Sequence, residues 1–385
     1  MKEVLLKMLR EINGTSVMVW LSLLGRPNYL IYSLLLKEFG SAEGIYNAFL
    51  AGRKPESLRA YENVLTAFAD QGLAAQAAEI CNKAEECGMK IVTLNDVNYP
   101  YKLRNLPSAC PLVLYYYGEI NEEDFSEDGV SVAVVGSRHC SVSGEANAES
   151  FSYELSKRGV NIVSGLARGC DGAAHTGALK AGGRTTAVLA SGADVIYPPE
   201  HRNMYNRIIR SGGCVMSESP PGTIPCKQLF PARNRIIAGL SDAVIVVEAA
   251  KKSGALITAD RALEADRLVF ALPGDVRNPM AYGANELIRQ GAVCALDVGI
   301  VLEELGIADE KAVKRKPGNG SATGLPYPQN AVYNAIIHGA VNADEIAAVT
   351  QLEINDIGSA LTLLEVRGLI KSTGTGMVRE SLGDR

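Results

Sequence analysis

The sequence predicts an α/β protein built around a Rossmann-like, doubly wound and mostly parallel sheet. Across residues 131–300, short apolar runs alternate with helical patterns of about ten to fifteen residues, which is typical of successive βαβ units. Runs such as Val244–Val247 are apolar throughout, as in strands buried on both faces. Glycine-containing turns follow several runs, and ligands of such sheets bind at the carboxyl ends of the strands.

The strands of this sheet are expected where apolar runs are bounded by glycine or polar residues. They are Val132–Val135, Asn161–Ser164, Thr186–Leu189, Cys214–Ser217, Ala243–Val247 and Leu268–Ala271. We expect their domain to cover residues 131–305. The preceding residues 91–130 have extended character and predict a connector.

A helical domain is expected over residues 1–90, where apolar residues recur at helical spacing. It is interpreted as an all-α domain of the SAM or helix-hairpin-helix type. Such a hairpin presents a Gly-x-Gly turn to phosphate, and the breaker Gly25-Arg26-Pro27 lacks that turn. Because the region is also acidic, a packing or partner role is favoured over DNA contact.

The C-terminal part predicts a winged-helix domain over residues 326–385, joined by a polar, glycine-rich linker at residues 306–325. Three helical patterns are followed by a short strand and a glycine-containing turn. A helix that reads DNA carries Arg, Lys, Asn or Gln on its exposed face. The third helix here is mainly acidic, so an interaction role is favoured over sequence reading.

The charge distribution confines a polyanion site to the centre of the chain. The 385 residues carry 38 Lys and Arg against 43 Asp and Glu, a net charge of −5. Residues 131–300 carry 18 against 15 and are net positive, whereas residues 1–130 carry 12 against 17 and residues 301–385 carry 8 against 11. A phosphate-bearing ligand is therefore expected in the central domain.

Cysteine usage and hydropathy indicate a cytoplasmic protein. None of the eight cysteines forms a Cys-x-x-Cys pair, so no zinc site, redox dithiol or disulfide framework is expected. The apolar run Val17–Leu24 is too short to span a bilayer and lacks a cleavage site after it, so it predicts a buried helix. No Walker A motif occurs, which disfavours an ATP motor. No metal or cofactor is expected.

The first candidate ligand loop is Gly136-Ser137-Arg138, after the first strand. The spacing of Gly136 and Gly144 does not match the dinucleotide fingerprint. Ser137 and the following N–H groups are expected to bind an anion at the N-terminus of the next helix. Arg138 offers a planar guanidinium that can bind phosphate with two hydrogen bonds. The alternative is a structural ion pair of Arg138.

The second candidate is the stretch from Ser164 to His175. Gly165 and Gly169 allow the backbone to approach a ligand closely. Asp171 and His175 are four residues apart on a helix start, which suggests an acid/base pair. A structural role is favoured, in which Asp171 serves the helix N-terminus and His175 packs with it.

The third candidate, and the one with the most weight, is the expected loop from Lys227 to Arg235. Phe230 can stack on a base, which is typically worth about 1–3 kcal/mol per base. Lys227, Arg233 and Arg235 can neutralise phosphates. The alternative places Phe230 in the core and the arginines in ion pairs, one of them with Glu248. The turn at Ser253-Gly254 is compatible with a phosphate.

In combination these motifs make residues 131–300 resemble the DNA-processing A (DprA/Smf) family of bacterial natural transformation. Their order and spacing over roughly 160 residues carry the resemblance. The matching pieces are Gly136-Ser-Arg138, Ser164-Gly-Leu-Ala-Arg-Gly-Cys-Asp-Gly-Ala-Ala-His175, Tyr197-Pro198, Phe230-Pro-Ala-Arg-Asn-Arg-Ile-Ile-Ala-Gly239, Ser253-Gly-Ala-Leu-Ile-Thr258 and Gly283-Ala-Asn-Glu-Leu-Ile-Arg-Gln-Gly-Ala292. One departure is Ser143-Gly144, where many members have Tyr-Gly.

The resemblance implies a protein that is not an enzyme. It would bind and protect incoming single-stranded DNA, and load the recombinase RecA by displacing single-strand-binding protein. It would work as a homodimer through the Rossmann-like domain. The implied DNA-binding residues are Gly136, Ser137, Arg138, Ser164, Gly165, Arg168, Gly169, Lys227, Phe230, Arg233, Asn234, Arg235, Lys252 and Ser253.

Two other classes of function stay open at this point. One is a nucleotide-binding or nucleoside phosphoribohydrolase-type enzyme, with Asp171, His175 or Glu248 as acid/base groups. Such enzymes carry a P-G-G-x-G-T turn, whereas this chain has Lys252-Ser-Gly-Ala-Leu-Ile-Thr258. The other is a scaffold that acts only through the winged helix.

Overall fold

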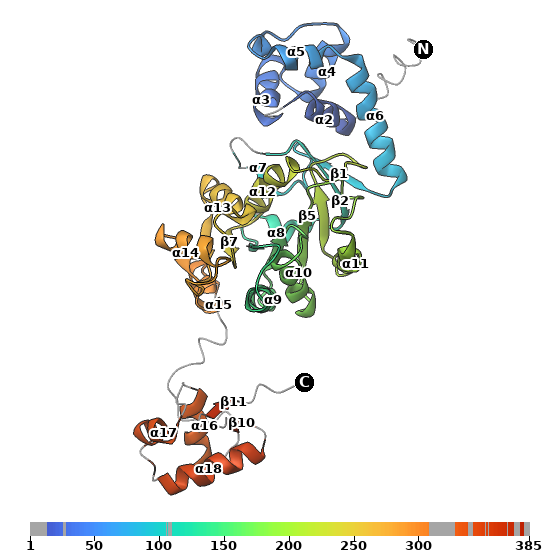
Figure 1. The fold of residues 1–385 in the computed structure, drawn as a ribbon. Coiled ribbons are helices and arrows are strands. Elements are labelled where there is room, and N and C mark those ends of the chain that lie inside the picture. The colour runs from blue at the N-terminus through green and yellow to red at the C-terminus, as the bar shows by residue number, and fades with distance from the viewer. Residues whose placement is uncertain are drawn as a thin grey trace. The chain divides into compact units, whose positions relative to one another are not determined.

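The structure is a computed structural model, and it forms two compact units, residues 1–308 and 309–385 (Figure 1). The residues that it describes are 14–25, 28–104, 106, 110–307, 328–337, 342–350, 352, 354–367, 369–372 and 378–380. Nearly all of the expected linker at 306–325 lies outside the described residues.

The first unit is organised by a nine-stranded sheet with the order β1-β2-β6-β5-β4-β3-β7-β8-β9. Strands β3 to β9 are all parallel to one another. Their bounds are β3 Ser131–Val135, β4 Asn161–Ser164, β5 Thr185–Val188, β6 Cys214–Ser217, β7 Ala243–Val246, β8 Leu268–Ala271 and β9 Val293–Cys294. The predicted parallel strands are confirmed, each within one residue of its expected ends; β9 was not predicted.

The segment expected as a connector also enters this sheet. β1 (Lys90–Thr93) pairs antiparallel with β2 (Val113–Gly118), which pairs antiparallel with β6. Alternate side chains of β2 face two different cores: Leu114 and Tyr116 pack against the sheet's helices, and Val113 and Tyr115 pack against the N-terminal helices. The segment is extended, as expected. Because β2 pairs with β6 and packs on both faces, the segment is part of the sheet and not a connector.

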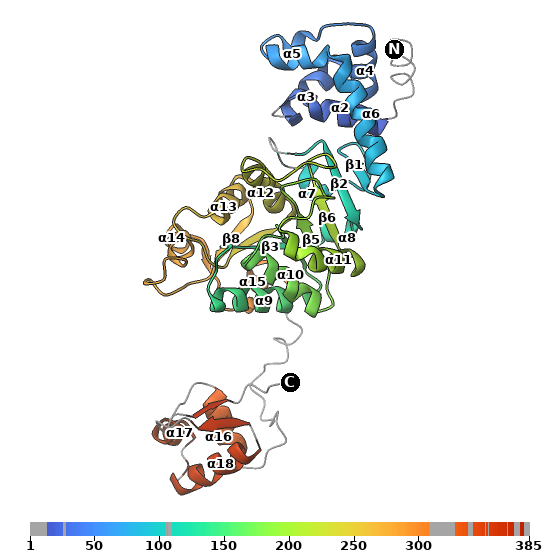
Figure 2. The same cartoon turned by 45° about the vertical axis from the view of Figure 1, so that its right-hand side comes forward.

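Helices cover both faces of the sheet, as Figure 2 shows. Val132 and Val134 of β3 pack towards one set of helices, and Ala133 and Val135 pack towards the other. The first set is α9 (Val142–Ser156), α10 (Cys170–Lys180) and α15 (Val298–Glu304), and the second includes α12 (Leu229–Leu240), α13 (Gly254–Glu264) and α14 (Tyr282–Arg289). Helix α11 (Arg202–Arg210) packs near β5 and β6.

The N-terminal part of this unit is helical, as predicted. Its core surrounds Trp20, which is fully buried and contacts the rings of Tyr46, Phe49 and Phe68. Its helices are α2 Gly14–Leu23, α3 Asn28–Phe39, α4 Ala42–Leu50, α5 Glu62–Phe68 and α6 Gln71–Glu86; the short helices α7 Tyr101–Arg104 and α8 Glu122–Phe125 follow β1 and β2. None of the helices in the described part of the chain has the length and apolar character needed to cross a membrane.

The second unit has the helix order and small sheet of a winged helix, as predicted. Helices α16 (Gln329–Ile337), α17 (Ala343–Thr350) and α18 (Ile354–Val366) surround a core that includes the fully buried Ile346 and Leu364. Strands β10 (Ile370–Ser372) and β11 (Val378–Glu380) pair antiparallel.

Candidate nucleic-acid interface

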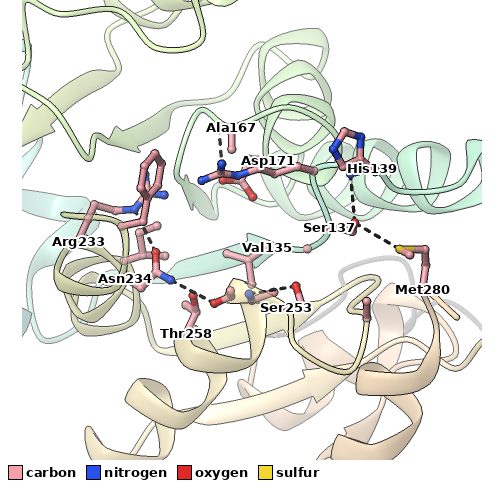
Figure 3. A pocket seen from close by; sticks show the side chains of 17 residues that line it. Val135, Ser137, His139, Ala167, Asp171, Arg233, Asn234, Ser253, Thr258 and Met280 are labelled. Carbon is pink, nitrogen blue, oxygen red and sulfur yellow. Dashed lines mark hydrogen bonds between the residues drawn. The ribbon is translucent and has the colours of Figure 1, made fainter. Parts of the chain in front are cut away.

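A pocket of about 330 Å³ opens at the carboxyl ends of β3 and β7. The strands β3, β4, β5 and β6 follow one another towards one edge of the sheet, and β7, β8 and β9 follow one another towards the other edge. The connections that leave the adjacent strands β3 and β7 therefore turn away from each other. Ligands of open α/β sheets bind at such a switch point. The walls come from the loop after β3, the start of α10, the first half of α12 and the start of α13 (Figure 3).

Arg138 stacks on Phe230 at this pocket. The guanidinium carbon lies 4.3 Å from the centre of the ring. The ring of Tyr197 meets the same phenyl ring edge-on, 6.1 Å away at 67°. Arg138 is exposed, and no carboxylate among the described residues pairs with it. The pocket therefore presents an aromatic surface and a cation whose hydrogen-bond donors can meet a phosphate.

The stretch expected as a loop from 227 to 235 is mostly helix α12, which begins at Leu229. Helical spacing decides which side chains reach the pocket. Phe230, Arg233 and Asn234 are three and four residues apart and line it together. Arg235 faces elsewhere, and its guanidinium forms a 2.5 Å ion pair with Glu218. Arg235 is therefore not part of the pocket, and its predicted place in the groove is corrected.

Arg233 lies in the pocket wall and is buried. Its Nη1 donates to the carbonyl oxygens of Gly165, at 2.8 Å, and Val188. Its Nε donates to Oδ1 of Asn234 at 3.1 Å (Figure 3). Burial lowers the pKa of Arg233 to about 10, so the group stays charged at neutral pH. Its donors hold the loop after β4 and the end of β5, and its charge lies beside the Asp171 carboxylate, which also lines the pocket.

Asp171 and His175 make separate hydrogen bonds and do not act as a pair. Asp171 Oδ2 accepts from the backbone N–H groups of Gly165, at 3.1 Å, and Ala167, at 3.4 Å. His175 Nδ1 bonds to Thr185 Oγ1 at 2.7 Å. Both side chains are buried, and burial raises the pKa of Asp171. Asp171 therefore has a structural role, as favoured, but its carboxylate holds the turn before α10 instead of capping the helix.

The N-terminus of α9, expected to bind an anion, already holds a carboxylate of the chain itself. Glu248 accepts hydrogen bonds from the N–H of Ser141, at 2.8 Å, and from its hydroxyl, at 2.5 Å. The N–H of Ser137 donates to the carbonyl oxygen of Glu248 at 2.7 Å. The predicted anion site at Ser137 and this helix is therefore wrong, and so is the predicted pairing of Glu248 with an arginine.

Other predicted residues support the pocket from behind. The hydroxyl of Ser164 is buried and donates to the carbonyl oxygen of Val134 at 2.7 Å. Gly165 takes part through its backbone, since a Cβ there would come 2.5 Å from the Arg233 guanidinium. Gly169 has φ +69°, and a Cβ there would come 2.4 Å from the carbonyl oxygen of Ser137. Glycine at these positions lets the loops after β3 and β4 pack closely.

Further predicted residues lie at the periphery. Arg168 is exposed and pairs with Glu200. Lys227 and Lys252 are exposed and do not line the pocket. Ser253 does line it and caps α13, accepting from the N–H of Ala255 at 3.3 Å.

Sequence reasoning missed some of the residues that shape this site. Met280 lines the pocket and its sulfur accepts from Ser137 Oγ at 3.6 Å (Figure 3). Tyr197, 39% exposed, supports Phe230. Tyr197 belongs to one of the motifs that carry the resemblance, and its position after β5, at the same sheet edge as the other motifs, could have indicated a role for its ring. Across the described residues, no group of three or more His, Cys, Asp and Glu side chains is arranged to hold a metal ion.

The fold and this pocket define a Rossmann-like α/β protein with a cationic, aromatic site at the switch point of its sheet. Residues 90–306 match the family model for DNA recombination-mediator protein A, and residues 316–374 match the DprA winged helix domain. The chain belongs to the DNA recombination-mediator protein A family.

Relatives agree with this membership. Protein Smf from Synechocystis is 37% identical over 310 residues, which cover 73% of this chain and 77% of the relative. The solved structure of DNA processing protein A from Streptococcus pneumoniae is 35% identical, with a TM-score of 0.55, and covers 72% of this chain and 97% of that one. Separately from this membership, the chain is similar to DNA processing protein A from Helicobacter pylori, solved for its single-stranded DNA binding mode, which is 29% identical over 56% of this chain and 95% of that one, with a TM-score of 0.48.

Proposed function

We propose that this chain binds single-stranded DNA at the pocket between β3 and β7 and acts as a recombination mediator. The observation that carries the proposal is the stack of the exposed Arg138 guanidinium on Phe230. A base can stack on such a platform, and phosphate can meet the donors of Arg138. Double-stranded DNA keeps its bases stacked inside the helix, so this chemistry selects single strands.

The proposed contact set is narrower than the one expected from sequence. Arg138 and Phe230 contact the strand directly, and Arg233 adds buried positive charge. Ser253 and the start of α13 add a partly positive helix end on the same wall. We propose that the exposed Lys227 and Lys252 neutralise phosphates that flank the pocket.

We propose binding without turnover. A phosphoribohydrolase needs an acid/base group that faces its ligand. Asp171 lines the pocket, but its Oδ2 accepts from two backbone N–H groups, and Glu248, which does not line the pocket, is held by Ser141 at the start of α9. His175 bonds to Thr185 inside the fold. These contacts favour a binding protein over the enzymatic alternative.

We further propose that the chain loads RecA onto the bound strand and displaces single-strand-binding protein, in natural transformation. Homodimerisation through the Rossmann-like domain and a cytoplasmic location are parts of the same proposal. Family membership supports them. The test is the DNA-dependent ATPase of RecA on strands precoated with single-strand-binding protein: the chain should shorten the lag, and an unchanged lag would count against loading.

Fluorescence anisotropy of labelled oligonucleotides tests the binding proposal. Single strands should bind far more tightly than duplexes, with a steep loss of affinity as salt rises. Arg138→Ala and Phe230→Ala together should abolish the single-strand preference. The incubation of nucleoside monophosphates with the protein should release no base. Equal affinity of the double variant and the unsubstituted protein would overturn the site.

A further inference from the structure

A second pair of an aromatic ring and a cation stands beside the pocket, on the side of α13 and α14. Tyr282 is the first residue of α14 and is 48% exposed. The ammonium of Lys251 lies 5.5 Å from the centre of its ring. The next residue, Lys252, is also exposed. This pair repeats the chemistry of Arg138 and Phe230 and was not among the residues indicated by the sequence.

The two loops that carry this pair are fixed to one another. The N–H of Gly283 donates to the carbonyl oxygen of Ala249 at 2.6 Å. A Cβ on Gly283 would come 2.7 Å from that oxygen, so only glycine lets the start of α14 lie directly on the loop after β7. Tyr282 and Lys251 are therefore held side by side by backbone contacts.

The pair is also tied to the pocket. Met280 lines the pocket and precedes Tyr282 by two residues, and Ala250 and Ser253 line it on either side of the two lysines. Since consecutive Cα atoms are about 3.8 Å apart, the Cα of Tyr282 is within about 8 Å of that of Met280. A strand that leaves the pocket on this side meets Tyr282 within a short distance.

We propose that Tyr282 stacks on a second base of the single strand, while Lys251 and Lys252 bind the phosphates beside that base. This inference rests on the proposed function of the pocket and extends it to a two-point site. Phe230 lies on α12 and Tyr282 on α14, so the strand passes from one ring to the other along the carboxyl edge of the sheet.

Lys251 can leave the ring of Tyr282 and contact a phosphate instead when the strand binds. An exposed contact between an ammonium and a ring is weaker than the stacking of a base on a ring. The released lysine then gains a phosphate partner. Glu286 is the carboxylate nearest in sequence on α14, and it is already held by Arg289, at 2.5 Å, and by Gln290, at 2.9 Å. Its charge is therefore largely compensated and does not repel the strand.

A mononucleotide and a longer oligothymidylate separate the two contact points, because a single base can stack at only one of them. We would measure the affinity of the full chain for thymidine 5′-monophosphate and for a strand of about 16 nucleotides, the upper limit of common single-strand site sizes. Tyr282→Ala should weaken the long strand about 5- to 100-fold, which is the loss of one stacked base, and leave the mononucleotide within about twofold. Tyr282→Phe should bind both as the unsubstituted protein does.

Titrations at several salt concentrations separate the contribution of charge to DNA affinity from that of stacking. Tyr282→Ala should leave the dependence of log affinity on log salt unchanged for the long strand. Replacement of Lys251 and Lys252 by Ala should make that slope shallower by about 0.7 for each phosphate that a lysine no longer neutralises.

The control variant is Phe230→Ala, which should weaken the binding of both the mononucleotide and the long strand. If Phe230→Ala weakens binding and Tyr282→Ala does not, the second stacking point is overturned and the pocket stands. If neither variant weakens binding, the proposed function of the pocket fails together with its extension.

Discussion

The carboxylate of Glu248 accepts hydrogen bonds from both the backbone N–H and the hydroxyl of Ser141, the N-cap of α9. A helix N-terminus attracts negative charge, and here the chain supplies that charge from the end of β7. The phosphate site expected at this helix is therefore filled from within. An incoming anion meets Arg138 on the pocket side instead.

This arrangement makes Gly144 essential for packing. A Cβ on Gly144 would come 2.5 Å from the carboxyl carbon of Glu248. Gly144→Ala must therefore displace Glu248 from Ser141 or shift α9, and we expect a loss of about 1–3 kcal/mol in the free energy of unfolding. Urea denaturation measures this loss.

The matched control is Gly254→Ala, because Gly254 also lies in the first turn of a helix. A Cβ there meets no atom within 4 Å. Its replacement should leave stability unchanged or raise it by up to about 1 kcal/mol. Equal stabilities of the two variants would contradict the close packing of Glu248 against α9.

Arg138 and Arg235, which the sequence predicts in the same groove, should differ sharply in their effect on DNA affinity. Arg138→Ala removes the exposed guanidinium that stacks on Phe230. We expect single-stranded DNA to bind about 10- to 100-fold more weakly, which is the loss of one charge-assisted contact, with a salt slope shallower by about 0.7. Anisotropy titrations across a salt series measure both quantities.

Arg235→Ala is the control for that substitution. Its guanidinium is paired with Glu218 away from the pocket, so affinity and salt slope should stay as in the unsubstituted protein. The free energy of unfolding should fall instead, since Glu218 loses a largely buried partner. A strong loss of DNA affinity in Arg235→Ala would contradict the placement of α12.

The sequence was sufficient for the parallel strands β3 to β8 because their signals are local. The runs at β3, β4 and β7 are apolar and bounded by turns, and their strands form where expected. The turn at Ser253 and the helix after it also form as expected, since Ser253 accepts from the N–H of Ala255. Strand and helix-cap chemistry depends on neighbours along the chain.

The site was harder to predict because two of its determinants are not local. Helical spacing in α12 directs the side chains of Arg233 and Arg235 to different sides of the helix. A stretch interpreted as a loop does not show which side chains share a face. The contact of Glu248 with Ser141 joins residues 107 positions apart. No periodic pattern encodes that contact, so the sequence left the helix end open to a ligand.

His175 should make the protein sensitive to acid. The hydroxyl of Thr185 donates to the carbonyl oxygen of Ile162, so it accepts from Nδ1–H of His175. Nε2 is then a bare acceptor, and no described residue partners it. Burial lowers the pKa of His175 to about 3. Stability is complete above the ordinary pKa of 6.5 and should fall by up to about 1.4 kcal/mol per pH unit between 6.5 and 3.

Urea denaturation at several pH values, with His175→Asn as the reference, isolates this effect. Asparagine can keep the bond to Thr185 but does not titrate. The unsubstituted protein should lose stability relative to the variant as the pH falls below 6.5. Asp171 changes stability in the opposite direction as the pH falls, since burial raises its pKa. Because Asp171 is present in both proteins, its contribution cancels in the comparison. Parallel pH profiles would contradict the buried neutral imidazole.

Removal of the winged helix should leave DNA binding intact. Every residue that lines the pocket, and the Tyr282 pair beside it, belongs to the unit of residues 1–308, and the second unit has its own core. A protein ending at residue 308 should therefore bind single strands within about twofold of the full chain, since no direct phosphate or stacking contact is removed. Residues 309–385 alone should bind weakly. If binding instead followed the second unit, the pocket would be a feature of the fold and the winged helix would be the functional module.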